Sequence, residues 1–355
     1  MLDWTPVKAR PFLVRTVARL GGCTFAGQKL GRTEEWMDTT VNYATTVFMA
    51  AIKLQFFPKW ARPVAQYLIS DLYEIPRMVG KVQALLTPVA EERLRNAELL
   101  GYEDEKPDDF IQWFLDALPE QQKRRFDIQA HLQLILGAAS IHTTSNLVTD
   151  CVYDLAMHQD LQDELRQEAE EVLGGENNDN WFGNDSLTRL WKMDSFMRES
   201  QRMNGNVTSF IRKVMRPIDL SDGTHLPAGT SLLTPLAGIS RDERFYSNPN
   251  SFDGLRFWRL RQRSPVPDGS SKGMSDDAGR WQFTSVGDAH VNFGLGRHAC
   301  PGRFFAAVEA KMILAYLLLR YDIRLQEGEG RPKPMMFMMM KSPNQDAEIM
   351  FRRRS

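Results

Sequence analysis

The chain has 355 residues, of which 43% are hydrophobic and 25% charged, so it is globular and long enough for one large domain or two ordinary ones. Its formal net charge of −1 gives no electrostatic basis for binding nucleic acid. The cysteines Cys23, Cys151 and Cys300 are sparse and odd in number, which argues against a disulfide framework and for a reducing compartment. We find no apolar run long enough to span a bilayer or to serve as a signal peptide.

The first two thirds of the chain has the apolar spacing of helices. Residues 125–158 form the longest such segment, without a proline and apolar on most faces, so we expect this helix to cross the middle of the domain. Residues 60–98 predict two helices divided near Pro76. The other helices are expected at 33–56, 109–118, 160–173 and 186–204.

The pattern changes after residue 204. Residues 210–234 contain short strand-like runs separated by Ser221-Asp222-Gly223 and Pro227-Ala228-Gly229, which are turn signals. Residues 261–290 are polar and predict a loop, whereas 302–320 predict a helix and 335–350 further strands. These patterns together indicate a mainly α protein with a small β region.

One stretch of the sequence, FGLGRHACPG at 293–302, carries distinctive chemistry. Pro301 suits the first position of a helix, which would place Cys300 near the N-cap of helix 302–320, where free backbone N–H groups favour a thiolate. The glycines leave room for a large planar group, and Arg297 and His298 can pair with carboxylates at its edge. These features fit a haem held by an axial cysteine.

Cys300 has two other interpretations. A cysteine at a helix start is often only a buried structural residue, and an isolated cysteine would favour that interpretation. A zinc site fits less well, because His298 and Cys300 have no second Cys/His pair at ligand spacing.

The string from Phe293 to Gly302 resembles the haem-binding loop of cytochrome P450 monooxygenases, whose pattern is Phe-x-x-Gly-x-Arg-x-Cys-x-Gly. Phe293, Gly296, Cys300 and Gly302 match this pattern. His298 stands where the family has arginine, with Arg297 beside it, a variant similar to many fungal members. The resemblance implies haem b as cofactor, Cys300 as its axial ligand, and the other loop residues as haem contacts.

Two further motifs occur in the order that the family has them. Glu199-Ser200-Gln201-Arg202 resembles the family's Glu-x-x-Arg motif. Residues 249–257, PNSFDGLRF, supply Arg256 at the position of the family's later arginine. The resemblance implies that Glu199, Arg202 and Arg256 form a buried structural network. It also implies that Arg212 contacts a haem propionate.

The long helix contains a third partial match. The family pattern Ala-Gly-x-(Asp/Glu)-Thr-Thr corresponds here to residues 139–144, ASIHTT, so His142 replaces the acid. The resemblance implies that Thr143 assists O2 activation, with His142 as a proton relay. The alternative for this stretch is packing of small residues, with the hydroxyl bonded back to its own helix.

The resemblance covers the whole chain and implies one haem-thiolate domain, 1–355, with a P450 fold lacking its N-terminal strands and helices. Family members normally begin with a membrane anchor and the first strands of the sheet, and this sequence has no counterpart of them, so we expect an N-terminally truncated product. The resemblance also implies a location at the cytosolic face of the endoplasmic reticulum. Segments 204–210, with Asn206, Val207 and Phe210, and 335–341 correspond to substrate-pocket segments of the family.

The implied function is oxidation of an apolar small molecule in fungal secondary metabolism, for example a terpenoid. It would use O2 and electrons from an NADPH–cytochrome P450 reductase, with no nucleic acid partner. Two alternatives stay open. One is a haem-thiolate enzyme that rearranges or dehydrates its substrate without monooxygenation. The other is a truncated, inactive remnant.

Overall fold

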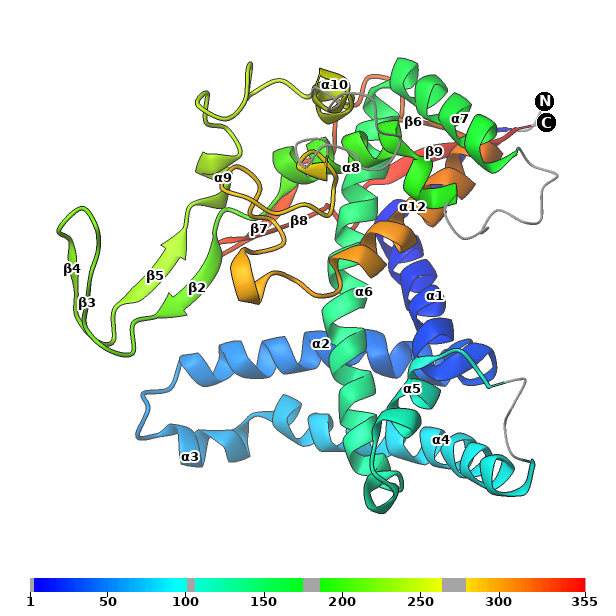
Figure 1. The fold of residues 1–355 in the computed structure, drawn as a ribbon, viewed down its shortest axis with the longest axis vertical. Coiled ribbons are helices and arrows are strands. Elements are labelled where there is room, and N and C mark those ends of the chain that lie inside the picture. The colour runs from blue at the N-terminus through cyan, green and yellow to red at the C-terminus, as the bar shows by residue number, and fades with distance from the viewer. Residues whose placement is uncertain (1–2, 101–105, 175–185, 264–278, 355) are drawn as a thin grey trace, which may run out of the picture. The chain divides into compact units, whose positions relative to one another are not determined.

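The computed structural model describes residues 3–100, 106–174, 186–263 and 279–354 (Figure 1). The chain divides into two compact units: Pro11–Ser145, and Met1–Arg10 together with Asn146–Ser355. The expectation that residues 1–355 form one haem-thiolate domain stays a prediction. Among the described residues, none of the helices combines the length and apolarity needed to cross a membrane.

The unit Pro11–Ser145 is built from helices. They are α1 (Ala9–Gly31), α2 (Glu34–Gln55), α3 (Arg62–Ala65), α4 (Ser70–Leu100), α5 (Phe110–Ala117) and the first part of α6 (Phe126–Met157), with short 3₁₀ turns at Gln66–Leu68 and Glu120–Gln122. Helix α2 packs on α4, and the fully buried Trp36, Leu86 and Leu134 belong to one apolar core. The Thr33 and Asp109 side chains cap α2 and α5 by accepting backbone N–H bonds.

The predicted helices 33–56, 109–118 and 125–158 are confirmed within a residue or two. The expected division near Pro76 is wrong: α4 continues through both Pro76 and Pro88. A proline removes one backbone bond from a helix interior, but the buried Val79, Val82, Leu86 and Ala90 give α4 a continuous apolar stripe in the core. Tertiary packing therefore outweighs the local cost of the prolines.

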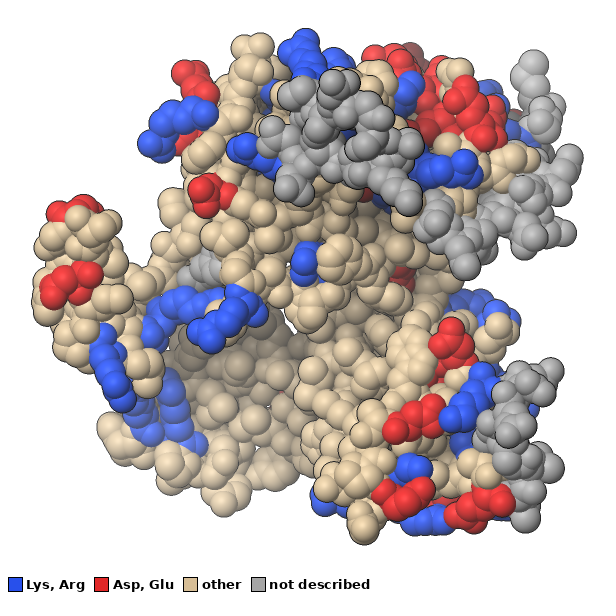
Figure 2. All heavy atoms as spheres, viewed as in Figure 1, with Lys and Arg blue, Asp and Glu red and all other residues tan. Residues whose placement is uncertain are grey.

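The unit containing Asn146–Ser355 mixes helices and small sheets. Its helices are α7 (Gln159–Leu173), α8 (Trp191–Asn204), α9 (Leu236–Ile239), α10 (Arg256–Arg263) and α12 (Arg303–Arg320), with 3₁₀ turns at Ser186–Arg189 and Gly296–His298. Helix α7 packs on α8 and α12, and α8 packs on α10. Acidic side chains gather over α7 (Figure 2), because its apolar residues Leu161, Leu165 and Leu173 are buried on the opposite face. Helix α7 ends at Gly174, which adopts the left-handed conformation.

Three antiparallel strands form the largest sheet, in the order β1 (Thr5–Lys8), β9 (Glu348–Arg353) and β6 (Tyr321–Arg324). Thr5 pairs with Phe351, and Tyr321 pairs with Arg353. Three two-stranded ribbons complete the β structure: β2 (Ser209–Lys213) with β5 (Ser231–Thr234), β3 (Ile218–Asp219) with β4 (His225–Leu226), and β7 (Met335–Phe337) with β8 (Met340–Ser342). The prediction of a mainly α protein with a small β region is confirmed.

Candidate functional site

The Cys300 loop lies between α10 and α12. Cys300 is exposed, and its backbone N–H donates to the carbonyl of Phe293 over 2.6 Å, which closes the loop. Ala299 N–H donates to Gly296 O at 3.1 Å, and Gly294 N–H donates to Val291 O at 3.0 Å. The loop is therefore held by its own backbone bonds and presents one thiol at its end.

Two glycines make this loop geometry possible. Gly294 and Gly296 have φ values of 85° and 62°, in the left-handed region that side chains disfavour. A Cβ on Gly294 would lie 3.0 Å from the carbonyl oxygen of His298, whereas a Cβ on Gly296 would meet no atom within 4 Å. Gly294 is thus required by close packing inside the loop, and the surface above Gly296 is open.

The position of Pro301 differs from the sequence expectation. Helix α12 begins at Arg303 with Gly302 as its N-cap, so Pro301 precedes the helix. Cys300 lies two residues before the cap. The Arg303 guanidinium donates to Cys300 O at 2.8 Å and to Thr284 O at 3.0 Å, which fixes the turn between the loop and α12.

The other two cysteines differ from Cys300 in their surroundings. Cys151 is completely buried on α6, and burial raises the pKa of its thiol well above the ordinary value. Cys23 is half-buried on α1. Cys300 is therefore the cysteine, among the three, whose thiol is open to a ligand.

The three predicted network residues come together in the structure. Arg202 makes a bidentate ion pair with Glu199, with N···O distances of 2.7 and 2.8 Å, and neither side chain is exposed. Arg256, from the start of α10, places its Nε 3.2 Å from each oxygen of the same carboxylate. One buried carboxylate thus joins two guanidinium groups from different elements.

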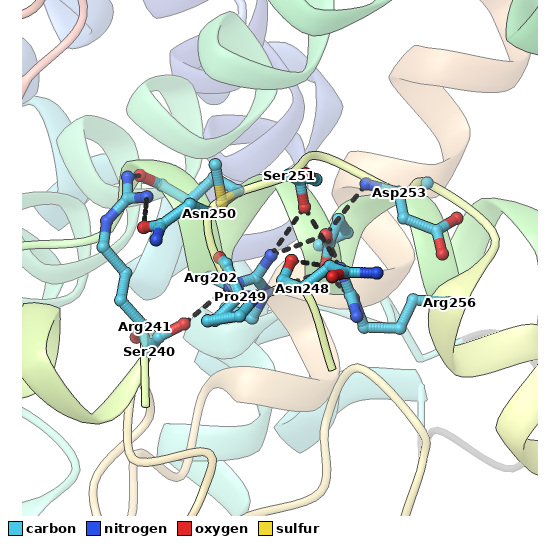
Figure 3. A network of polar contacts seen from close by, with 12 residues as sticks. Arg202, Ser240, Arg241, Asn248, Pro249, Asn250, Ser251, Asp253 and Arg256 are labelled. Atoms are coloured by element: carbon cyan, nitrogen blue, oxygen red, sulfur yellow. Dashed lines mark hydrogen bonds and ion pairs between the residues drawn. The ribbon is translucent and has the colours of Figure 1, made fainter. Parts of the chain in front are cut away.

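Backbone carbonyls satisfy the remaining guanidinium N–H groups, as Figure 3 shows. Arg202 donates to the carbonyls of Ser240 and Pro249, each at 2.6 Å. Arg256 donates to Ser247 O at 2.5 Å, and both arginines donate to Ser251 O. The network consequently fixes the irregular segment 247–253 against α8.

The predicted haem-contact cations occupy exposed positions, whereas Phe293 is half-buried. Arg297 and His298 lie in the 3₁₀ turn of the Cys300 loop, and both are exposed. Arg212 lies on β2, where its guanidinium donates to Ile211 O at 3.0 Å. Phe293 packs edge-on against the fully buried ring of Phe283, with centroids 5.1 Å apart.

Thr143 and His142 lie on α6 in the unit Pro11–Ser145. The Thr143 hydroxyl donates back to Ala139 O at 2.6 Å, so in this structure it is bonded to its own helix. His142 Nε2 lies 2.9 Å from Val41 O, and it must donate there because a carbonyl only accepts. Each side chain therefore has a backbone partner inside its own unit.

The two segments expected to line a substrate pocket are joined by hydrogen bonds. Val207 N–H donates to Met339 O at 3.2 Å, and the Asn206 side chain accepts from Lys341 N–H at 2.9 Å. The apolar side chains of residues 335–340 are all exposed, between 42% and 77%. The side chain of Phe210 lies outside the described residues.

Sequence reasoning missed a buried acidic pair on α6. Asp150 and Asp154 both pair with Arg331, at 2.8 and 2.5 Å, and Asp154 also accepts from Ser200 and Asn204 of α8. Burial raises the pKa of Asp150 to about 6, and the Arg331 charge opposes that shift. Two acids four residues apart lie on one face of a helix, so their presence in the largely apolar 125–158 segment could have indicated a buried cation partner.

Comparisons with known proteins agree with this fold. The cytochrome P450 family profile matches residues 16–350. The structure of retinoic-acid-bound cyanobacterial CYP120A1 is similar with a TM-score of 0.68 at 19% identity, covering 98% of this chain and 70% of that one, which shows the same fold. The long α6, the Glu199 network and the cysteine loop before α12 are thus parts of a P450 fold.

Two similar sequences come from fungi. Cytochrome P450 monooxygenase AN1598 of Emericella nidulans is 34% identical over 99% of this chain and 63% of its own length. Cytochrome P450 monooxygenase gliF of Aspergillus fumigatus is 36% identical over 98% of this chain and 68% of its own length. This chain belongs to the cytochrome P450 family. It spans less than two thirds of the first of these relatives.

Family and fold imply haem b as the cofactor, and the Cys300 loop fits it. The loop offers an exposed thiol, which is the donor that a haem-thiolate centre needs, and an open surface above Gly296. A Cβ on Gly302 would lie 3.9 Å from Cys300 Sγ, so glycine also keeps that side of the sulfur clear.

Proposed function

We propose that this chain is the haem-thiolate part of a monooxygenase that hydroxylates or oxidises an apolar small molecule, with Cys300 as the axial ligand. The main observation for this proposal is the exposed Cys300 in a chain of the P450 family. Its loop is shaped by two glycines in the left-handed conformation. When bound, haem supplies the reductive activation of O2. The protein's share is to hold the thiolate, bind the substrate and deliver protons.

The test is the absorption spectrum of the reduced, CO-bound protein. The parent chain should show the Soret band of a thiolate-ligated haem, and Cys300→Ala should lose it. Cys23→Ala is the matched control, because it removes a half-buried thiol from α1 and should retain the band. Absence of any haem spectrum in the folded parent chain would instead support the inactive-remnant alternative.

Around Cys300 we assign haem contacts to Phe293, Gly296, Gly302, Arg297, His298 and Arg212. The exposed cations Arg297 and His298 lie three and two residues before the thiol, respectively, where they can pair with propionates. Arg297→Gln should weaken haem retention, and His298→Gln should do so independently if both cations contribute. The measurement is the rate of haem transfer to an acceptor protein.

For proton delivery we propose Thr143, with His142 as a relay. The Thr143 hydroxyl would have to exchange its bond to Ala139 O for one to the reacting groups. Thr143→Val should lower product formed per NADPH by about tenfold or more, with the CO-bound spectrum unchanged, and Thr143→Ser should restore it. Thr16→Val is the control, because that hydroxyl makes the same bond back to Phe12 O on α1.

The electron donor that we propose is an NADPH–cytochrome P450 reductase, and the substrate an apolar secondary metabolite such as a terpenoid. The fungal relatives are named as monooxygenases, which supports oxidation with O2, and the reductase and the terpenoid are our inference from the family resemblance. Reaction under 18O2 separates it from rearrangement chemistry: one labelled oxygen in the product supports monooxygenation, and an unlabelled product overturns it.

We further propose that the protein acts at the cytosolic face of the endoplasmic reticulum. An exposed apolar stretch after α2 supports contact with a membrane surface: Phe56, Trp60, Val64, Tyr67 and Leu68 are 68% to 83% exposed. Flotation with phospholipid vesicles should fall for Phe56→Ser/Trp60→Ser. The exposed Trp113→Ser on α5 is the control and should float like the parent chain.

A further inference from the structure

Helix α8 carries a second buried polar group beside Glu199 and Arg202. Arg198 is 3% exposed, and its Nη1 donates to the carbonyls of Arg280 and Gln282, each at 2.8 Å. Its guanidinium also lies over the ring of Phe257, 4.3 Å from the centroid. Burial lowers the pKa of Arg198 to about 10, so the group stays charged at neutral pH.

Asp194, one turn earlier on α8, makes two contacts of a similar kind. One carboxylate oxygen accepts from the backbone N–H of Phe283 at 2.6 Å. The other pairs with Lys311 Nζ at 2.7 Å, and both side chains are nearly buried, with 11% and 7% exposed. Lys311 lies in α12, the helix that follows the Cys300 loop. Asp194 therefore joins α8 both to the segment before the loop and to the helix after it.

The attached segment continues directly into the loop. Phe283 packs its ring edge-on against Phe293, and the Phe293 carbonyl accepts the N–H of Cys300. Arg303, the first residue of α12, donates to Thr284 O and to Cys300 O. Each contact in this series is short and specific, so a displacement of residues 280–284 would be transmitted to Cys300.

We propose that Asp194 and Arg198 are positioning residues that fix the Cys300 loop by holding both of its flanks on α8. The Glu199 network holds a different segment, 247–253. Helix α8 therefore anchors two separate segments through two separate groups of side chains. Only the expected effect on haem ligation rests on the proposed function. The attachment of the loop is a property of the chain itself.

The main experiment is hydrogen exchange of the purified chain, with Arg198→Gln and with the double variant Asp194→Leu/Lys311→Met. The double variant removes both buried charges together, so no unpaired charge is left to unfold the protein. We expect exchange of the bonded amides in 287–300 to rise about tenfold or more, with amides of α7 unchanged. Unchanged exchange at 287–300 in both folded variants would overturn the proposal.

Lys192→Gln is the matched control. Lys192 is also a cation of α8, but its Nζ pairs with Glu164 of α7 at 2.9 Å and not with residues 280–284. This variant should exchange like the parent chain, and loosening of 287–300 in it would equally contradict the proposal. Arg198→Lys should restore part of the protection, because an ammonium keeps the charge and its N–H donors but lacks the planar guanidinium face that lies over the Phe257 ring.

A second readout connects the loop to its function. In the haem-loaded variants, the CO-bound spectrum should shift from the thiolate-ligated form to one without thiolate, while haem content falls less than in Cys300→Ala. If the parent chain binds no haem, the proposed function fails while the exchange result still decides the role of Asp194 and Arg198.

Discussion

Arg202 and Glu199, three residues apart on α8, face one another as a bidentate ion pair from which water is excluded. On a helix surface such a pair would contribute little, because water and salt screen it. Here the carboxylate also accepts from Arg256 and from the Asp253 N–H, so all the charges in the cluster have partners. Removal of one member would leave the others buried and unpaired.

Glu199→Gln should therefore lower the free energy of unfolding by about 3–5 kcal/mol, the usual effect of breaking a buried ion pair. The matched control is Glu164→Gln, which removes the partner of Lys192 at the surface and should cost about 1 kcal/mol or less. Urea unfolding followed by far-UV circular dichroism measures both. Equal losses in the two variants would contradict the central role of the Glu199 network.

Asp150 should make stability depend on pH. Its pKa of about 6 lies above the ordinary value near 4, so between these values the folded chain holds a proton that the unfolded chain has released. Stability from this group is present at low pH and is lost as pH rises towards 6, by up to about 1.4 kcal/mol per unit.

In Asp150→Asn this contribution is absent, so the variant should gain stability relative to the parent chain as pH rises from 4 to 6. Asp154, Arg331 and Lys341, which also face this site, remain in both proteins. Urea unfolding at half-unit pH steps gives the difference. A difference that stays constant across this range would show that Asp150 does not titrate there.

The cysteines should differ in reactivity. At pH 7.5, iodoacetamide should modify Cys300 in the folded chain and leave Cys151 unmodified, because Cys151 is inaccessible and burial raises the pKa of its thiol. Peptide mass spectrometry measures each site separately. Addition of urea beyond the unfolding midpoint should make Cys151 react, and modification of Cys151 before unfolding would show that α6 is open there.

The two left-handed glycines of the loop should respond unequally to alanine. Gly296→Ala should cost about 1–2 kcal/mol, the penalty for a left-handed side-chain residue, because its Cβ meets open space. Gly294→Ala adds contact with His298 O and should cost more and expose the amide of Cys300. Unfolding and hydrogen exchange measure the pair, and equal effects would mean that the loop relaxes around Gly294.

Local sequence patterns predicted most of the helices because their spacing of apolar residues is a property of each segment. Thr33, Asp109 and Gly174 mark helix ends through bonds made within a few residues. Pro76 misled the prediction because a proline lowers helix stability locally, whereas the buried side of α4 restores it through distant contacts. The start of α12 lies two residues after Pro301, the position expected for it, because a proline also fits a turn that precedes a helix.

The candidate site divides in the same way. The sequence alone determined the family motifs, with Cys300, Glu199, Arg202 and Arg256, because their identity and order along the chain carry that information. Only the tertiary structure decided what these residues touch, and it added Asp194, Arg198 and Arg331. The partners of Arg198 are backbone carbonyls more than 80 residues away along the chain, and the acidic partners of Arg331 are more than 170 residues away. Such contacts arise from packing of whole elements, which no local spacing encodes.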